Sequence, residues 1–333
     1  MSGWPPSRVI WSAYPLGFLV LFLSLISLST FPVEASPNKK GSLRSKSSIQ
    51  KTSSTQAKRQ AHQASPTQFD SDSVYRGWDW LVGRLLAKGV ARADLISIYA
   101  NPKFPPFTFV PFSPDPKESS GMYTGFLKAP MYELARDFMS GHSRQFDLIE
   151  RTLKVPREVV TAILLIETQF GRNTGDHIVL YRLSRIATTG EPGNIDKNLK
   201  RLKPEMPNLT RETLVRRAKY LEDVFLPEIP ALIEIGKRNH IDPLNVKGSI
   251  AGAFGLPQFL PSAFLRFGVD GDKNGFVSLF SEVDAIWSAA NYLSSYGYRE
   301  DLSLADKRAV IWKYNKSDAY IDTVLAVARA IQE

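Results

Sequence analysis

A single carboxylate stands near the end of the most apolar helical stretch of the chain. The stretch VVTAILLIETQFGRNTG runs from Val159 to Gly175, and its one acid is Glu167. At helical spacing Glu167 shares a face with Val160, Ile163 and Leu164. A glutamate in such surroundings is either a structural acid or a carboxyl group kept protonated for chemistry.

The expected surroundings of Glu167 suit acid catalysis. Burial against Ile163, Leu164 and Phe170 should disfavour the charged form, and the C-terminal end of a helix dipole acts in the same direction. Such a group can hold its proton near neutral pH and then serve as a base. Glycoside cleavage generally needs an acid of this kind to protonate the leaving oxygen.

Helices must position this carboxylate, because apolar residues recur at helical spacing through most of the chain. Pro156 suits the first turn of the helix that carries Glu167, and Gly171 its C-terminal stop. Residues 101–121 are rich in Pro and Phe, which predicts an extended segment that is packed rather than free. Residues 191–210 are polar and contain three prolines, which predicts a loop. We see no clear strand, so the fold class is mainly α. The other predicted helices are 75–88, 92–99, 129–152, 211–240 with breaks at Pro227 and Pro230, 283–296 and 319–331.

The composition excludes several classes of site. The chain has 333 residues, is 43% hydrophobic and contains no cysteine. Disulfides, thiolate metal sites and a cysteine nucleophile are therefore excluded. The net charge of +9 invites a nucleic-acid interpretation, but residues 1–66 hold eight basic residues and one acid, which leaves only +2 for residues 67–333. A nucleic-acid-binding surface needs its charge on the folded part, so we do not expect nucleic acid as a partner.

The N-terminal residues predict export. Arg8 precedes the apolar run Leu16 to Leu28, and Val33 and Ala35 place small residues before a possible cleavage site. Residues 1–35 are therefore a signal peptide or, if uncleaved, an N-terminal anchor. Residues 36–69 are rich in Ser, Thr, Gln and Lys and predict a disordered basic linker. We expect an exported protein of the periplasm or cell envelope.

Three further stretches carry a resemblance together with ETQFGRNTG. They are DPLNVKGSIAGAFGLPQFLPSAF (242–264), DGDKNGFVSLFSEVDAIWSAANYL (270–293) and YNKSDAY (314–320). In this order and spacing they resemble the membrane-bound lytic murein transglycosylase B family, over about residues 123–320. The resemblance implies a lysozyme-like helical catalytic domain over 70–333, with its core at about 153–320 and a helical lobe at 70–152.

The resemblance also implies a mechanism with one carboxylate. Glu167 would protonate the oxygen that links N-acetylmuramic acid to N-acetylglucosamine in peptidoglycan. It would then take the proton of the C6 hydroxyl, which closes a 1,6-anhydro ring. No organic cofactor is implied, and the expected partner is the glycan strand, bound by a monomer.

Substrate contacts follow from the same resemblance. Glycines let a backbone pass close to a sugar, and Ser and Gln can hydrogen-bond acetamido and hydroxyl groups. Leu256-Pro257 stands where relatives usually have an aromatic residue and a glycine. Arg216 and Arg217 follow the 191–210 insertion, and the alternative for them is an exposed, solvated pair. For the aromatic residues the alternative is core packing. The implied substrate-binding residues are Ser249, Gln258, Tyr292, Tyr314, Asn315, Tyr320, Arg216, Arg217 and Tyr123.

A loop from residue 270 resembles an EF-hand. Ser281 occupies position 12, where a bidentate Glu is expected, and Asp284 at position 15 matches a variant loop of the family. Oxygen ligands without Cys or His indicate a hard cation, Ca²⁺ or Na⁺, in a structural role. A simple turn is the alternative. The candidate ligands are Asp270, Asp272, Asn274, the Phe276 carbonyl and Asp284.

Two other functions remain open. A lysozyme-like hydrolase would pass the same glycan to water, and a non-catalytic peptidoglycan-binding protein would need no acid. The presence of Glu167 counts against the second. The mass of the product distinguishes the hydrolase from the transglycosylase, because an anhydro end is lighter than a hydrolysed end by one water.

Overall fold

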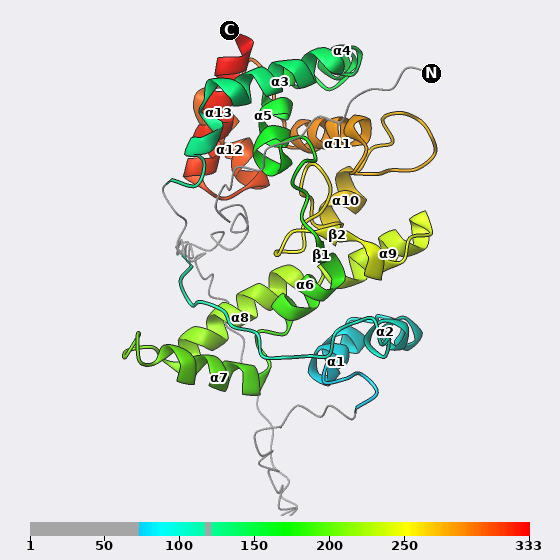
Figure 1. Ribbon diagram of the computed structural model, residues 1–333, viewed down its shortest axis with the longest axis vertical. Coiled ribbons are helices and arrows are strands. Elements are labelled where there is room, and N and C mark those ends of the chain that lie inside the picture. Colours follow the sequence, from blue (N-terminus) through cyan, green and yellow to red (C-terminus); the bar gives the residue numbers. More distant parts are fainter. Residues whose placement is uncertain (1–72, 117–120) are drawn as a thin grey trace, which may run out of the picture.

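The computed structural model describes residues 73–116 and 121–333. The predicted signal or anchor (1–35) and linker (36–69) lie outside these residues. The described part of the chain is mostly helical, which confirms the predicted class (Figure 1). In that part, no helix combines the length and the apolar character needed to cross a membrane.

Loops of varied length join the helices, and the two strands have two residues each. The first elements are α1 (Asp79–Ala87), α2 (Arg92–Tyr99), η1 (Thr124–Phe126), α3 (Ala129–Gly141), α4 (Ser143–Thr152), α5 (Arg157–Thr168), β1 (His177–Ile178), α6 (Val179–Ala187) and α7 (Pro192–Leu202). The others are α8 (Arg211–Phe225), α9 (Glu228–Asn239), η2 (Pro243–Asn245), β2 (Lys247–Gly248), α10 (Pro261–Phe267), α11 (Glu282–Ser295), α12 (Leu304–Tyr314) and α13 (Asp318–Gln332).

Helix α5 is the centre of one hydrophobic core. Every residue from Val159 to Thr168 is buried, because α3, α4, α11 and α13 pack around it (Figure 1). A second core joins α1, α2, α6, α8, α9 and α10. Full burial of a Val, Leu or Ile side chain contributes about 1.5–3 kcal/mol. The apolar run at 159–166 therefore fixes α5 firmly in its place.

The ends of α5 differ slightly from the prediction. Pro156 is the N-cap residue just before the first turn. The helix ends at Thr168, because Gln169, Phe170 and Gly171 all adopt left-handed backbone conformations, with φ of 50°, 58° and 87°. The stop is therefore built by two non-glycine residues before the predicted Gly171.

The segment after α5 packs closely on residues 242–261, which include Gly248, Gly252 and Gly255. β1 pairs antiparallel with β2, so that His177 lies opposite Gly248. A Cβ atom on Gly175 would lie 2.3 Å from the carbonyl oxygen of Gly248. Only glycine permits this approach, which places residues 171–175 against the loop that carries Ser249 and Gln258.

The predicted loop at 191–210 is wrong, because residues 192–202 form helix α7. Pro192 lies in the first turn, where a missing N–H does no harm, and the Glu191 carboxylate accepts from the N–H groups of Gly193 and Asn194. The buried side chains of Asn194 and Asn198 hydrogen-bond to backbone groups of Val110 and Phe112. The extended segment 101–116 is thereby packed, as predicted for 101–121.

Other boundaries shift by a few residues. The first helix begins at Asp79 rather than residue 75, and the predicted helix 129–152 is divided into α3 and α4 at His142. The predicted helix 211–240 breaks at Leu226–Pro227, whereas Pro230 sits in the first turn of α9 and breaks nothing.

Candidate active site

The carboxyl group of Glu167 lies in the last turn of α5, in the apolar surroundings that its sequence predicts. Glu167 is 8% exposed, and Ile163 and Leu164 on the same helix are fully buried. The Tyr320 hydroxyl of α13 donates a hydrogen bond of 2.7 Å to Oε1 of Glu167. Burial raises the pKa of Glu167 to about 8, and the bond from Tyr320 opposes part of that rise. Glu167 is therefore protonated in much of the population at neutral pH.

Tyrosines from three helices and the segment before η1 gather near Glu167. The ring of Tyr123 packs edge-on against Tyr320 at 5.8 Å, and the rings of Tyr292 and Tyr314 lie 4.8 Å apart. Burial and the nearby Glu167 charge hold the pKa values of Tyr314 and Tyr320 well above their usual range. These phenols stay neutral, so they act as hydrogen-bond donors and add no charge.

The tyrosine hydroxyls are also bound to the backbone around the cluster. Tyr314 donates to the Pro257 carbonyl at 2.6 Å, and Tyr292 donates to the Lys313 carbonyl at 2.5 Å. The bond from Tyr314 connects the Glu167 cluster to residues 254–259, a short hairpin that carries Gln258. Tyr292, Tyr314 and Tyr320 thus serve packing and polar roles together, so the core-packing alternative holds at least in part.

Asn315 follows Tyr314 and has a free polar atom. Its side chain is 2% exposed, and its Oδ1 has no hydrogen-bond partner among the described residues. An unsatisfied buried acceptor costs about 1–3 kcal/mol. A ligand that donates a hydrogen bond could satisfy it.

Ser249 and Gln258 lie in the tight loop between β2 and α10, and both hold its shape. Ser249 Oγ accepts from the Ala253 N–H at 3.2 Å, and Gln258 Nε2 donates to the carbonyls of Thr174 (3.2 Å) and Gly255 (2.9 Å). Gln258 has a left-handed backbone with φ of 51°. Their predicted role as sugar contacts stays a prediction, and the structure shows that both side chains form hydrogen bonds that hold the shape of the loop.

Arg216 and Arg217 lie on α8, which packs on α6, α7 and α9. Arg216 is exposed, while Arg217 is 5% exposed with its guanidinium 5.8 Å from the ring of Tyr220. Burial lowers the pKa of Arg217 to about 10. Neither arginine forms a hydrogen bond or ion pair with a described residue. The exposed-pair alternative thus fits Arg216 and is wrong for Arg217.

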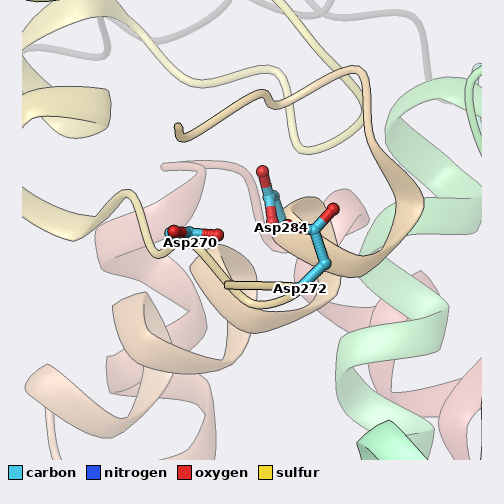
Figure 2. Close-up of side chains that lie close together, drawn as sticks. All are labelled: Asp270, Asp272 and Asp284. Carbon is cyan, nitrogen blue, oxygen red and sulfur yellow. The ribbon is translucent and has the colours of Figure 1, made fainter. Parts of the chain in front are cut away.

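The candidate cation loop brings three carboxylates together. Oxygen atoms of Asp270, Asp272 and Asp284 lie within 4.8 Å of one another (Figure 2). Asp284 is fully buried, and its two oxygens accept from the N–H groups of Gly271 (2.9 Å) and Ser278 (2.8 Å). Asp270 accepts from the Gly275 N–H at 2.8 Å, at the sharp turn of the loop.

The charge of this loop fits a hard cation. None of the three aspartates forms an ion pair with another described residue. Two unit charges 4 Å apart repel by roughly 1–4 kcal/mol, depending on the effective dielectric. Asn274 Oδ1 accepts from the Phe276 N–H at 2.9 Å. The side chain of Phe276 is exposed. The donor set suits Ca²⁺ or Na⁺.

Sequence reasoning missed Thr168, the residue after Glu167. Its hydroxyl donates to the Leu256 carbonyl at 2.9 Å and accepts from the Gly171 N–H at 3.0 Å. The available signal was a polar β-branched residue at the buried end of the apolar run. Its distant partner could not be read from the chain.

Comparisons with known proteins agree on the family. The family model described as the transglycosylase SLT domain matches residues 79–307. Membrane-bound lytic murein transglycosylase B of Escherichia coli (strain K12) is 31% identical over 144 residues, which are 43% of this chain and 32% of that protein. The match thus spans about a third of that relative.

Solved structures share the fold. The E. coli lytic transglycosylase Slt35 in complex with bulgecin A has a TM-score of 0.57 at 21% identity, over 77% of this chain and 92% of that one. Slt35 has also been solved with calcium, at a TM-score of 0.56, 20% identity and the same coverage. Pseudomonas aeruginosa SltB3 in complex with NAG-anhNAM-pentapeptide has a TM-score of 0.59 at 18% identity, over 78% of this chain and 80% of that one. The predicted lysozyme-like helical fold is therefore confirmed, and this chain belongs to the transglycosylase SLT domain family.

Proposed function

We propose that this protein is a peptidoglycan lytic transglycosylase with Glu167 as its single acid and base. The observation that supports this most directly is a buried carboxyl whose pKa is raised to about 8 by burial rather than by a neighbouring carboxylate. A two-carboxylate glycosidase would place a second acid beside the first. Among the described residues, the titratable side chains found next to Glu167 are the neutral Tyr314 and Tyr320 instead.

The proposed reaction has two steps. Protonated Glu167 gives its proton to the oxygen between N-acetylmuramic acid and N-acetylglucosamine, and the C1–O bond breaks. The muramic 2-acetamido oxygen stabilises the cation at C1. Glu167, now a carboxylate, takes the proton of the C6 hydroxyl as O6 bonds to C1, and the 1,6-anhydro product leaves with no water consumed.

The bond from Tyr320 supports both roles of Glu167. A phenol that donates to a carboxylate stabilises its charged form, so the proton can leave in the first step. Burial favours the return of a proton in the second step. A buried acid with one neutral donor is therefore suited to alternate between the two states.

The remaining predicted residues take proposed substrate roles. Asn315 Oδ1, which has no hydrogen-bond partner among the described residues, can accept from an acetamido N–H. Tyr292 and Tyr320 would offer a ring face to a sugar, and Tyr123 packs against Tyr320. Arg217 is buried and forms no ion pair with a described residue, so it is suited to a carboxylate of the peptide stem. Ser249, Gln258, Tyr314 and Arg216 complete the proposed set.

We also propose a structural Ca²⁺ or Na⁺ ion in the 270–284 loop. Asp270, Asp272 and Asp284 would hold it with their carboxylates, Asn274 with its amide oxygen and Phe276 with its carbonyl. The ion would offset part of the negative charge of the three aspartates. The calcium complex of Slt35 supports the choice of a hard cation for this fold.

The proposed cellular setting follows the sequence. Residues 1–35 would direct export and be cleaved or serve as the anchor, and 36–69 would link them to the catalytic domain. The E. coli relative is itself described as membrane-bound. We propose a protein of the periplasm or cell envelope that acts as a monomer on glycan strands.

Digestion of murein sacculi with the full chain tests the function. The expected products are 1,6-anhydro muropeptides, and Glu167→Gln should give none while remaining folded by circular dichroism. The matched control is Glu228→Gln, a buried glutamate whose oxygens both accept from Ser262 and which should keep its activity. Products heavier by one water would indicate the hydrolase instead, and full activity of Glu167→Gln would rule out the assignment of Glu167.

A further inference from the structure

The Thr168 hydroxyl links the end of α5, which carries Glu167, to the 254–259 hairpin. Thr168 is 1% exposed, directly follows Glu167, and ends α5. Its Oγ1 donates to the Leu256 carbonyl and accepts from the Gly171 N–H, at 2.9 and 3.0 Å. One hydroxyl therefore fixes both the left-handed stop of α5 and the neighbouring hairpin.

Leu256 belongs to a short hairpin that carries Gln258. The hairpin is closed by a bridge between Phe254 and Phe259. The carbonyl of Leu256 accepts from Thr168, and its N–H donates to the Leu279 carbonyl at 2.8 Å. The hairpin is thus held from one side by the helix of the acid and from the other by the segment between Ser278 and Ser281.

The side chains tighten the same contact. A Cβ atom added to Gly171 would lie 3.1 Å from a methyl group of Leu256, so the Leu256 side chain packs directly on the Gly171 backbone. The Pro257 carbonyl accepts from Tyr314, whose electrostatic neighbour is Glu167. Movement of the hairpin would therefore disturb the tyrosine cluster as well as Gln258.

We propose that Thr168 is a positioning residue whose hydroxyl sets the place of the Gln258 hairpin relative to the Glu167 carboxyl. This inference rests on the proposed function for its kinetic consequence. Displacement of a substrate-positioning group by about 1 Å costs on the order of 100-fold in rate. A bound glycan would keep its contacts with a loosened hairpin, so kcat should suffer more than KM.

The pH dependence offers a second consequence. Tyr320 from α13 and Tyr314 at the end of α12 face Glu167, Tyr123 lies behind Tyr320, and no described residue forms an ion pair with Glu167. The acid is therefore controlled mainly by burial. A loosened hairpin admits water, and the pKa of Glu167 then moves from about 8 toward the ordinary value of 4.5.

The test compares Thr168→Val, which keeps the shape and removes the hydroxyl, with Thr168→Ser, which keeps the hydroxyl. Thr161→Val is the matched control, because Thr161 is a fully buried threonine of the same helix whose Oγ1 has no hydrogen-bond partner in the described part of the chain. The assay uses the full chain and soluble glycan strands, over a range of pH and well below the unfolding temperature. Thr168→Ala replaces the valine variant if that variant does not fold.

We expect kcat of Thr168→Val to fall about 10- to 100-fold with KM changed less than about threefold. Its alkaline pH limb should move to lower pH. Thr168→Ser and Thr161→Val should match the wild-type protein. An unchanged rate and pH limb in Thr168→Val would overturn the inference. So would an equal loss in Thr161→Val, or a loss that follows only the unfolded fraction.

A separate measurement distinguishes this inference from the proposed function. If the wild-type protein releases no glycan product, the proposed function fails. Carbon-13 NMR titration of the Glu167 carboxyl still tests the positioning role of Thr168, because this measurement needs no substrate. A lower pKa in Thr168→Val supports the positioning role, and an unchanged pKa overturns it.

Discussion

Replacement of Glu167 by Gln should make the protein more stable at alkaline pH. The folded protein raises the pKa of Glu167 from 4.5 to about 8, so the folded state binds more protons than the unfolded state between these values. Stability that depends on this group is present below about pH 4.5 and is lost as pH rises toward 8. Gln has no such titration and keeps its stability across this range.

The size of the effect follows from the pKa difference. Each tenfold change in proton affinity corresponds to about 1.4 kcal/mol, so the change from 4.5 to about 8 corresponds to roughly 5 kcal/mol at full ionisation. Water that enters on ionisation reduces this value. We expect a difference of about 2–5 kcal/mol between the two proteins at pH 8.5, and less than about 1 kcal/mol at pH 5.

Urea unfolding of both proteins at several pH values measures this difference. The subtraction removes the contributions of other titrating groups, which are the same in both chains. Glu234→Gln, at a half-exposed position paired with Arg238, is the control and should differ from the wild-type protein by less than about 1 kcal/mol throughout. A difference for Glu167→Gln that stays constant between pH 5 and 8.5 would refute the reasoning from burial.

Two further predictions concern Tyr320 and the cation loop. Tyr320→Phe removes a hydrogen bond to the charged form of Glu167 that is worth about 1.5–3 kcal/mol. The proton affinity of Glu167 should therefore rise about tenfold or more, and the alkaline limb of activity should move to higher pH. An unmoved limb in a pH–rate profile would contradict it. Addition of Ca²⁺ at about 100 times its dissociation constant should stabilise the wild-type protein by about 2.7 kcal/mol, visible as a higher Tm by calorimetry. Asp284→Asn should lose most of this gain and the exposed Asp301→Asn none of it, whereas equal gains in all three proteins would exclude the loop as the ion site.

Local patterns predicted the parts of the site that depend on local physics. The apolar run before Glu167 predicted its burial, because a helix with no polar face has to be enclosed. The glycines around Ser249 and Gln258 indicated a backbone that can pass close to a sugar, which stays a prediction, and in the structure Gly248 packs against Gly175. The burial of Glu167 requires no knowledge of distant partners.

Features that depend on distant partners could not be predicted. The prolines and polar residues of 191–210 indicated a loop, but Asn194 and Asn198 find their partners at Val110 and Phe112, more than 80 residues earlier in the chain. The Arg pair shows the same limit. Arg216 and Arg217 are adjacent in sequence and similar in type, yet α8 exposes one and buries the other.

The end of α5 joins the strain in the backbone to the place of the acid. Gln169 and Phe170 both hold left-handed conformations, each of which costs a non-glycine residue roughly 1–2 kcal/mol. A helix that continued through them would avoid this cost but would carry the chain past the hairpin that holds Gln258. The Thr168 hydroxyl and the Gln169 N–H, which donates to the Leu165 carbonyl at 2.8 Å, offset the strain. Strain that is retained at such a point is typical of functional sites. The sharp stop therefore explains why Glu167 stands at the last buried turn, where a carboxyl can be enclosed by α13 and still face the loop opposite.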